Sequence, residues 1–91
     1  MDKKHLLERM AEVADLSNEP IPGKPLIEIV SDHSVLIENH CGVMSYSMEC
    51  VSVKTQYGCI IVNGSNMVLK KMSCDQLRIY GNIYRVELRR K

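Results

Sequence analysis

Short apolar runs recur along the chain from Pro25 onward, with centres about eight to nine residues apart. They read LIEIV, SVLIE, GVMSY, CVSVKT, CIIV, MVLKKM, LRIY and IYRVEL. The segments between them, such as NHC, NGSN and GN, have the composition of turns. This spacing predicts an all-β fold, a small antiparallel sandwich or roll of about seven or eight short strands. A short β-solenoid is the alternative, because regular spacing alone does not separate the two architectures.

Single runs indicate how their strands are buried. Val51, Val53 and Thr55 alternate with polar residues, which is typical of a strand with one face in the core. The run CIIV is apolar at every position and predicts a central strand covered on both sides, with Ile61 buried. At the sheet edges, Lys70 and Lys71 are predicted to guard one side, whereas PLIEIV is predicted to be open to pairing with another strand.

The beginning of the chain follows a different period. Leu6, Met10 and Val13 have the spacing of one helical face, and three prolines and a glycine in EPIPGKP then exclude both helix and central strand. The sequence therefore divides into four parts: an N-terminal amphipathic helix over 1–17, a Pro/Gly linker over 18–25, a β-domain over 26–88, and a basic tail over 89–91.

The charge balance and the targeting signals narrow the class of protein. Twelve basic side chains nearly cancel eleven acidic ones, which argues against a protein that binds nucleic acid through excess positive charge. No segment is long and apolar enough to cross a bilayer, and the first ten residues lack the apolar core of a signal peptide. We therefore expect a cytoplasmic protein without a transmembrane segment, whose cysteines are free thiols.

The segment IENHCG places a His beside a Cys, which raises the question of a metal or catalytic site. Adjacent residues on a strand point to opposite faces, so His40 and Cys41 do not form a dyad there. We interpret the segment as a strand end and turn, with Ile37 pointing into the core. Asn39 and Gly42 supply the backbone freedom of the turn. His40 and Cys41 are predicted to lie exposed on it.

The remaining candidate side chains give no site. Cys50, Cys59 and Cys74 lack the spacing of a zinc knuckle and are predicted to be small core or near-core residues. Tyr80 and Tyr84 are interpreted as partly buried packing residues with a polar tip. The sequence thus predicts no catalytic, cofactor-binding or metal-binding residue, no cofactor and no small-molecule substrate, and we expect a protein that is not an enzyme.

Three stretches, IENHCGVMSYS, VSVKTQYGCIIVNGSNMVLKKM and LRIYGNIYRVEL, resemble in their order the sporulation proteins of the YabP/YqfC family, and most closely its YqfC branch. The resemblance covers about residues 25 to 88. It rests on Ile37-Glu38-Asn39-His40 followed by Gly42, on the Gly58 to Gly64 segment leading into Leu69 and Met72, and on Gly81-x-Ile83. The YqfC branch often has a basic residue in place of Cys41.

The resemblance implies a protein made during sporulation in an endospore-forming bacterium, in the mother cell and at the forespore surface. The expected function is a non-enzymatic structural or interaction scaffold that assists morphogenesis of the spore envelope, its coat or cortex. Independently of the resemblance, the small core and the open strand edges predict a second copy as partner, in a homodimer. Another spore-envelope protein is the alternative partner. Two alternatives stay open: a small regulatory nucleic-acid-binding module, which requires a one-sided basic face, and a thiol- or metal-dependent enzyme, which requires several cysteines to converge.

Overall fold

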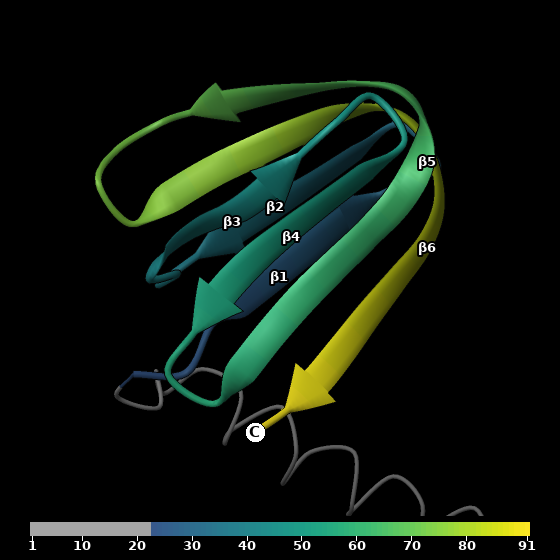
Figure 1. The fold of residues 1–91 in the computed structure, drawn as a ribbon. Coiled ribbons are helices and arrows are strands. Elements are labelled where there is room, and N and C mark those ends of the chain that lie inside the picture. The colour runs from purple at the N-terminus through teal and green to yellow at the C-terminus, as the bar shows by residue number, and fades with distance from the viewer. Residues whose placement is uncertain (1–22) are drawn as a thin grey trace, which may run out of the picture.

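The computed structural model describes residues 23–91, in which six strands form one antiparallel sheet (Figure 1). The strands are β1 (Leu26–Val30), β2 (Ser34–Glu38), β3 (Gly42–Tyr46), β4 (Cys50–Thr55), β5 (Gly58–Lys71) and β6 (Gln76–Arg90), in the spatial order β1-β2-β6-β5-β4-β3. The all-β prediction is confirmed, and antiparallel pairing throughout excludes the parallel rungs of a solenoid. The predicted N-terminal helix and most of the predicted linker lie outside the described residues.

A long hairpin, β5 and β6, organises the sheet. β2 pairs with the first part of β6, over residues 76–80, and β4 pairs with the first part of β5, over residues 58–63. Each end of the hairpin therefore carries two further strands: β1 and β2 at one end, β3 and β4 at the other. The hairpin bends sharply between these ends, so that the two halves of the sheet enclose one core (Figure 1).

The number of strands differs from the prediction because two expected turns are irregularities inside long strands. The pairing of β5 with β6 shifts register between Asn63 and Gly64 and again between Ser65 and Val68. A Cβ on Gly64 would collide with the carbonyl oxygen of Asn82 on the facing strand. Glycine inside a strand marks a bulge or a close backbone approach more often than the end of the strand. NGSN and GN therefore bend the hairpin instead of ending its strands.

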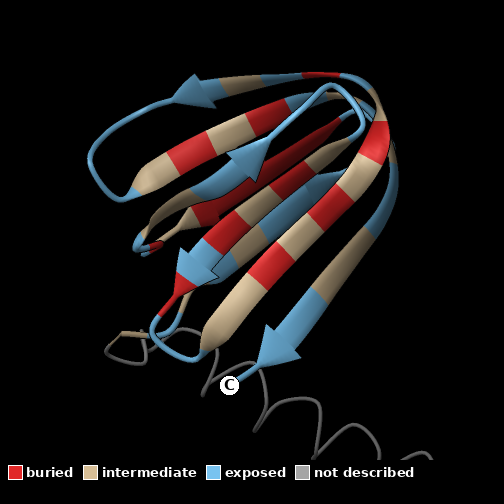
Figure 2. Cartoon of the chain, viewed as in Figure 1, coloured by how far each residue is buried: buried red, intermediate tan, exposed pale blue. Residues whose placement is uncertain are grey.

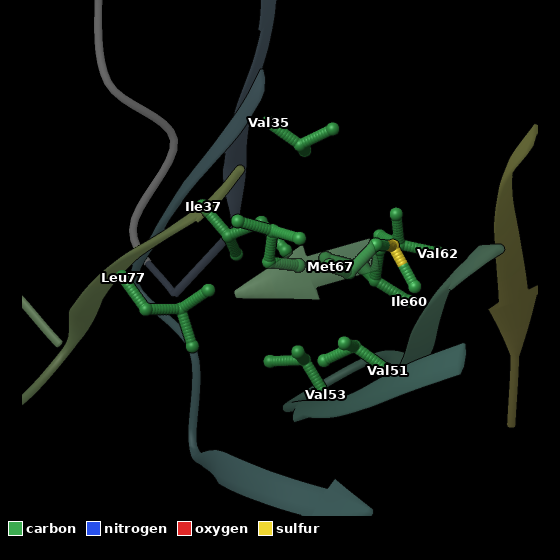
Figure 3. Packing of buried hydrophobic residues seen from close by; sticks show 9 residues of the cluster. Val35, Ile37, Val51, Val53, Ile60, Val62, Met67 and Leu77 are labelled. Carbon is green, nitrogen blue, oxygen red and sulfur yellow. The ribbon is translucent and has the colours of Figure 1, made fainter. Parts of the chain in front are cut away.

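The core lies between the two halves of the sheet, and its members among the described residues are aliphatic side chains and methionine (Figure 3). Its members are Val35, Ile37, Val51, Val53, Ile60, Val62, Met67, Leu77 and Ile79. Buried and more exposed residues alternate along β4 and the first half of β5, as the bands in Figure 2 show. The predicted one-sided burial of Val51, Val53 and Thr55 is confirmed.

The prediction that CIIV is covered on both sides is wrong. Ile60 and Val62 point into the core, whereas Cys59 and Ile61 lie on the opposite face and are only half-buried. β5 is central in the hydrogen-bonded order, but the facing half of the sheet covers only its inner side. A central position in a sheet therefore does not imply a second layer on each face.

Within the part of the chain that the structure describes, the sheet has open edges at both ends of its order, formed by β1 and β3. The prediction that PLIEIV forms an edge strand is confirmed. Within residues 23–91, β4 pairs only with the first half of β5, so the second half, with Lys70 and Lys71, also forms an edge, as predicted.

β6 continues through Arg90, two residues into the segment 89–91 that was expected to be a basic tail. The described residues include no helix long and apolar enough to span a membrane.

Candidate functional site

The segment IENHCG forms the end of β2 and the connection to β3, as predicted. Ile37 is fully buried, and Asn39 and Gly42 adopt positive φ angles of 63° and 130°. The side-chain amide of Asn39 donates a hydrogen bond of 3.1 Å to the carbonyl oxygen of Lys24, which ties the turn to the start of β1. Cys41 is exposed. The turn interpretation therefore holds for every residue of the segment except one.

His40 is buried, with 7% of its surface exposed, which corrects the prediction of an exposed side chain. The N–H of Gly42 donates a 2.9 Å hydrogen bond to Nδ1 of His40, and the N–H of His40 donates to the carbonyl oxygen of Asp75 at 3.2 Å. The connection between β5 and β6, which is distant in the sequence, thus holds His40 in place. Because Nδ1 accepts a hydrogen bond, the neutral ring carries its proton on Nε2, which is buried and has no partner among the described residues.

This geometry makes the stability of the domain depend on pH. Burial lowers the pKa of His40, an effect that outweighs the opposing influence of Asp75 and is reinforced by Lys71. A proton on Nδ1 would also remove the acceptor of the Gly42 hydrogen bond. The unfolded chain therefore binds this proton more readily than the folded one. The stabilisation is complete above the unfolded pKa of 6.5 and is lost as the pH falls through the lower folded pKa.

We expect the free energy of unfolding, measured by urea titration at intervals between about pH 7 and pH 5, to fall with decreasing pH. The His40→Gln variant should lose most of this slope, because glutamine keeps a hydrogen-bond acceptor but does not titrate. His33 provides the control, because its side chain is exposed. The His33→Gln variant should keep the slope, and equal slopes for the parent and the His40→Gln variant would contradict the assignment.

The four cysteines are free thiols and lie in different environments. Cys50 and Cys59 are half-buried, in agreement with a near-core position. Cys74 is exposed in the connection between β5 and β6, so its predicted place near the core is wrong. In residues 23–91, no three side chains of His, Cys, Asp or Glu come together in a metal-binding group.

A groove of about 220 Å³ runs between β1 and the C-terminal half of β6. Ile27, Ile60 and Leu88 supply its apolar lining. Lys24, Arg89 and Arg90 supply cationic side chains, and the Lys24 ammonium lies 4.5 Å from the centre of the Tyr57 ring. This groove offers apolar contact beside positive charge.

Positive charge along β6 is interrupted by one carboxylate. Arg85 and Arg89 both donate to Glu87, at 2.8 Å and 2.6 Å. The hydrogen bond from Arg89, together with the charges of both arginines and a hydrogen bond from Arg85, holds the pKa of Glu87 below its usual range. The one-sided basic face that a nucleic-acid-binding module requires is therefore broken at this point.

Tyr84, the second tyrosine that was predicted to be partly buried, lies in a β-bulge of β6. Tyr84 is 71% exposed, against the prediction of partial burial, and its hydroxyl lies 2.8 Å from Oγ of Ser65. In the pairing of β5 with β6, Asn63 faces Arg85 and Gly64 faces Ile83, so Tyr84 is the extra residue of a bulge. A bulged residue points away from the regular alternation of a strand, which explains its exposure.

Exposed apolar side chains from β1, the first half of β6 and the second half of β5 lie on one face of the sheet, to which β2 contributes the buried Ser34 and Leu36. We call the side of these strands that is turned away from the core the outer face. Leu26, Val30, Val68 and Tyr80 lie on it and are 55%, 42%, 57% and 42% exposed. Apolar area of this kind is unfavourable in water and is characteristic of interaction surfaces.

The sequence contains an indication of this surface, although the spacing of the apolar runs alone did not predict it. LIEIV has apolar residues at both parities: Ile27 packs against the core, whereas Leu26 and Val30 lie on the outer face. A half-buried strand on an otherwise solvated sheet alternates apolar with polar residues. Apolar residues at both parities, on a strand with one side on the core, indicate a second contact surface.

The fold and its surfaces define a small all-β protein whose exposed apolar face is built from regular strands. The family model of the YabP family matches residues 23–91, and the chain belongs to this family. Neither a curated protein nor a solved structure matches the chain.

Proposed function

We propose that this protein is a non-enzymatic sporulation protein, a structural or interaction scaffold that assists assembly of the spore envelope. Membership of the YabP family supports a role in sporulation. The observation that carries the scaffold role is the outer face, where β1, β5 and β6 present exposed apolar side chains beside charged ones. Regular strands hold these side chains in fixed relative positions, as a binding surface needs.

The proposal includes where and with what the protein acts. It works in the mother cell, at the forespore surface, without a cofactor and without a small-molecule substrate. Its partners are a second copy of the chain or other proteins of the coat or cortex. Within the family, the order of the motifs around Ile37, Gly64 and Gly81 favours the YqfC branch.

Deletion of the gene in the spore-forming host tests this function. We expect vegetative growth to be unchanged and the yield of heat- and lysozyme-resistant spores to fall. The intact gene should restore resistance, whereas a gene encoding Val68→Glu, which places a charge on the outer face, should not. Lys54→Glu is the matched control, because Lys54 is exposed on a strand of the other half of the sheet and should restore resistance.

Resistant spores in normal numbers from the deletion strain would refute the proposed function. If the purified protein retards DNA in a salt-dependent manner, the regulatory alternative is favoured instead.

A further inference from the structure

The outer face consists of three rows of side chains that run across the four strands, as the strand pairing defines them. The first row is Val30, Ser34, Tyr80 and Val68. The second row is Glu28, Leu36, Arg78 and Lys70. The third row is Leu26, Glu38 and Gln76, continued by Met72, whose N–H donates to the carbonyl oxygen of Gln76.

Charge is separated across these rows. The carboxylates of Glu28 and Glu38 lie on the β1 and β2 side, and the cations of Arg78 and Lys70 lie on the β6 and β5 side. Glu28 and Lys70 are exposed at opposite ends of the second row. Exposed apolar side chains also occupy both margins, with Val30 and Leu26 on one and Val68 on the other.

A two-fold axis parallel to the strands and midway between β2 and β6 relates the two margins to each other. It places β1 of one copy over β5 of the second copy, and β2 over β6. Glu28 then faces Lys70 of the second copy, and Val30 faces its Val68. The same operation sets Leu26 beside the second copy's Met72. At the margins, the acid thus meets a base and each apolar side chain meets an apolar one.

The other in-plane two-fold axis, perpendicular to the strands, does not bring opposite charges together. It lays each strand over itself, so that Glu28 faces Glu28 of the second copy and Lys70 faces its Lys70. Like charges in direct opposition are unfavourable at an interface. The charge pattern therefore selects the axis parallel to the strands.

We infer that two copies of this chain associate through their outer faces, around a two-fold axis parallel to the strands between β2 and β6. The inference rests on the proposed scaffold function and names its first partner, a second copy of the chain. An isologous contact of this kind repeats each pair twice, so Glu28 and Lys70 form two ion pairs per dimer. The approximately 30° angle between packed sheets shifts the margins by about one residue, which these long side chains can span.

The polar groups in the middle of the face fit the same arrangement. Nε of Arg78 is buried and has no hydrogen-bond partner among residues 23–91, and its guanidinium lies 6.0 Å from the centre of the Tyr80 ring. In the dimer, Arg78 lies over Leu36 of the second copy, with that copy's Glu28 and Glu38 in the same row and the next. Two carboxylates then lie near a guanidinium that the described chain leaves without an ion pair.

The size of the face limits the apolar area that association can bury. Four strands about 4.8 Å apart and about five residues long present roughly 300 Å² in projection. This lies well below the ~800 Å² per partner of a standard interface, so the dimer is a weak one. Pairing through the β1 edge, the other route to a dimer, would leave Val68 and Tyr80 in water, whereas the face contact covers them.

Sedimentation equilibrium of the full chain, from about 10 to 200 µM at low salt, tests the inference because this range spans weak association. We expect a monomer–dimer equilibrium for the parent. Glu28→Lys alone and Lys70→Glu alone should each weaken association at least tenfold, because each creates two like-charge contacts per dimer. Both substitutions in one chain should restore it. An equimolar mixture of the two single variants should form heterodimers, since both of its charge pairs are then opposite in sign.

Two controls keep the result interpretable. Glu49→Lys and Lys54→Glu make the same charge changes at exposed positions away from the outer face and should leave association unchanged. Unchanged melting temperatures would show that the variants fold. The inference is overturned if the parent stays monomeric, or if neither charge reversal weakens its dimer. The scaffold function would then act through a different contact. Normal spores after gene deletion, in contrast, refute the scaffold function and leave the dimer standing.

Discussion

Replacing Gly64 with alanine is expected to cost the domain about 3 kcal/mol or more, the upper range for forcing atoms into a packed interior. The added methyl group would overlap the carbonyl oxygen of Asn82 and lie 3.1 Å from Sδ of Met67. That carbonyl belongs to the backbone of β6 and cannot rotate away as a side chain would. The long hairpin would have to open at its bend, which brings the two halves of the sheet together. Urea denaturation followed by far-UV circular dichroism measures the loss.

Gly42→Ala is the matched control for this substitution. Gly42 has a positive φ of 130°, but a Cβ there would meet nothing within 4 Å. The control therefore measures backbone strain without a collision, on the order of 1–3 kcal/mol. Gly64 has ordinary backbone geometry and no space, so its substitution should cost more. If Gly42→Ala proved the more damaging change, close approach of β5 and β6 would not be what requires glycine at position 64.

Ile60→Ala is expected to cost about 2–5 kcal/mol, the usual range for a large-to-small change in a core. Ile60 is 1% exposed and packs in the single cluster between the two halves of the sheet. A domain of this size holds little more stability than that in total, so the variant should be largely unfolded near 37 °C. The shift of the urea midpoint at constant m-value reports the change.

Ile61→Ala is the control that distinguishes the loss of a buried isoleucine from the loss of a half-buried one. Ile61 is the next residue on the same strand, faces away from the core and is only half-buried. Its substitution should cost roughly half as much or less, because less apolar area returns to water on unfolding. A larger loss at Ile61 than at Ile60 would show that the core-facing side of β5 and its opposite side are assigned the wrong way round.

The parts of this fold that were predictable from the sequence are those governed by local alternation. Val51, Val53 and Thr55 reveal one buried face because side chains on a strand point alternately to its two sides. Asn39 and Gly42 reveal a turn because few other residues adopt their backbone angles. Each of these inferences needs only residues within one strand or one turn.

The parts that were not predictable depend on contacts between distant segments. His40 is buried because the connection at Asp75, far along the sequence, lies against its turn. Gly64 bends a strand instead of ending it because Asn82 approaches from β6. Ile61 is only half-buried because, within residues 23–91, only one half of the sheet packs against β5. None of these partners is visible from the residues adjacent to the position concerned.

The outer face was missed for a related reason. Val30, Val68 and Tyr80 come from three separate runs, and only the order β1-β2-β6-β5 makes them neighbours. The charge separation between Glu28 and Lys70 likewise exists only once these strands are aligned. A surface assembled from separate strands has no signature in any one of them.

The shared long hairpin also has a consequence for how the chain matures on the ribosome. The hairpin of β1 with β2 and that of β3 with β4 are synthesised first, yet within the described residues no ladder joins one to the other. Each finds its neighbour in the sheet only when β5 and β6 emerge, and β2 waits for residues 76–80. Folding should therefore be late and concerted, with both early hairpins presenting apolar surface to chaperones until translation of β6 is complete.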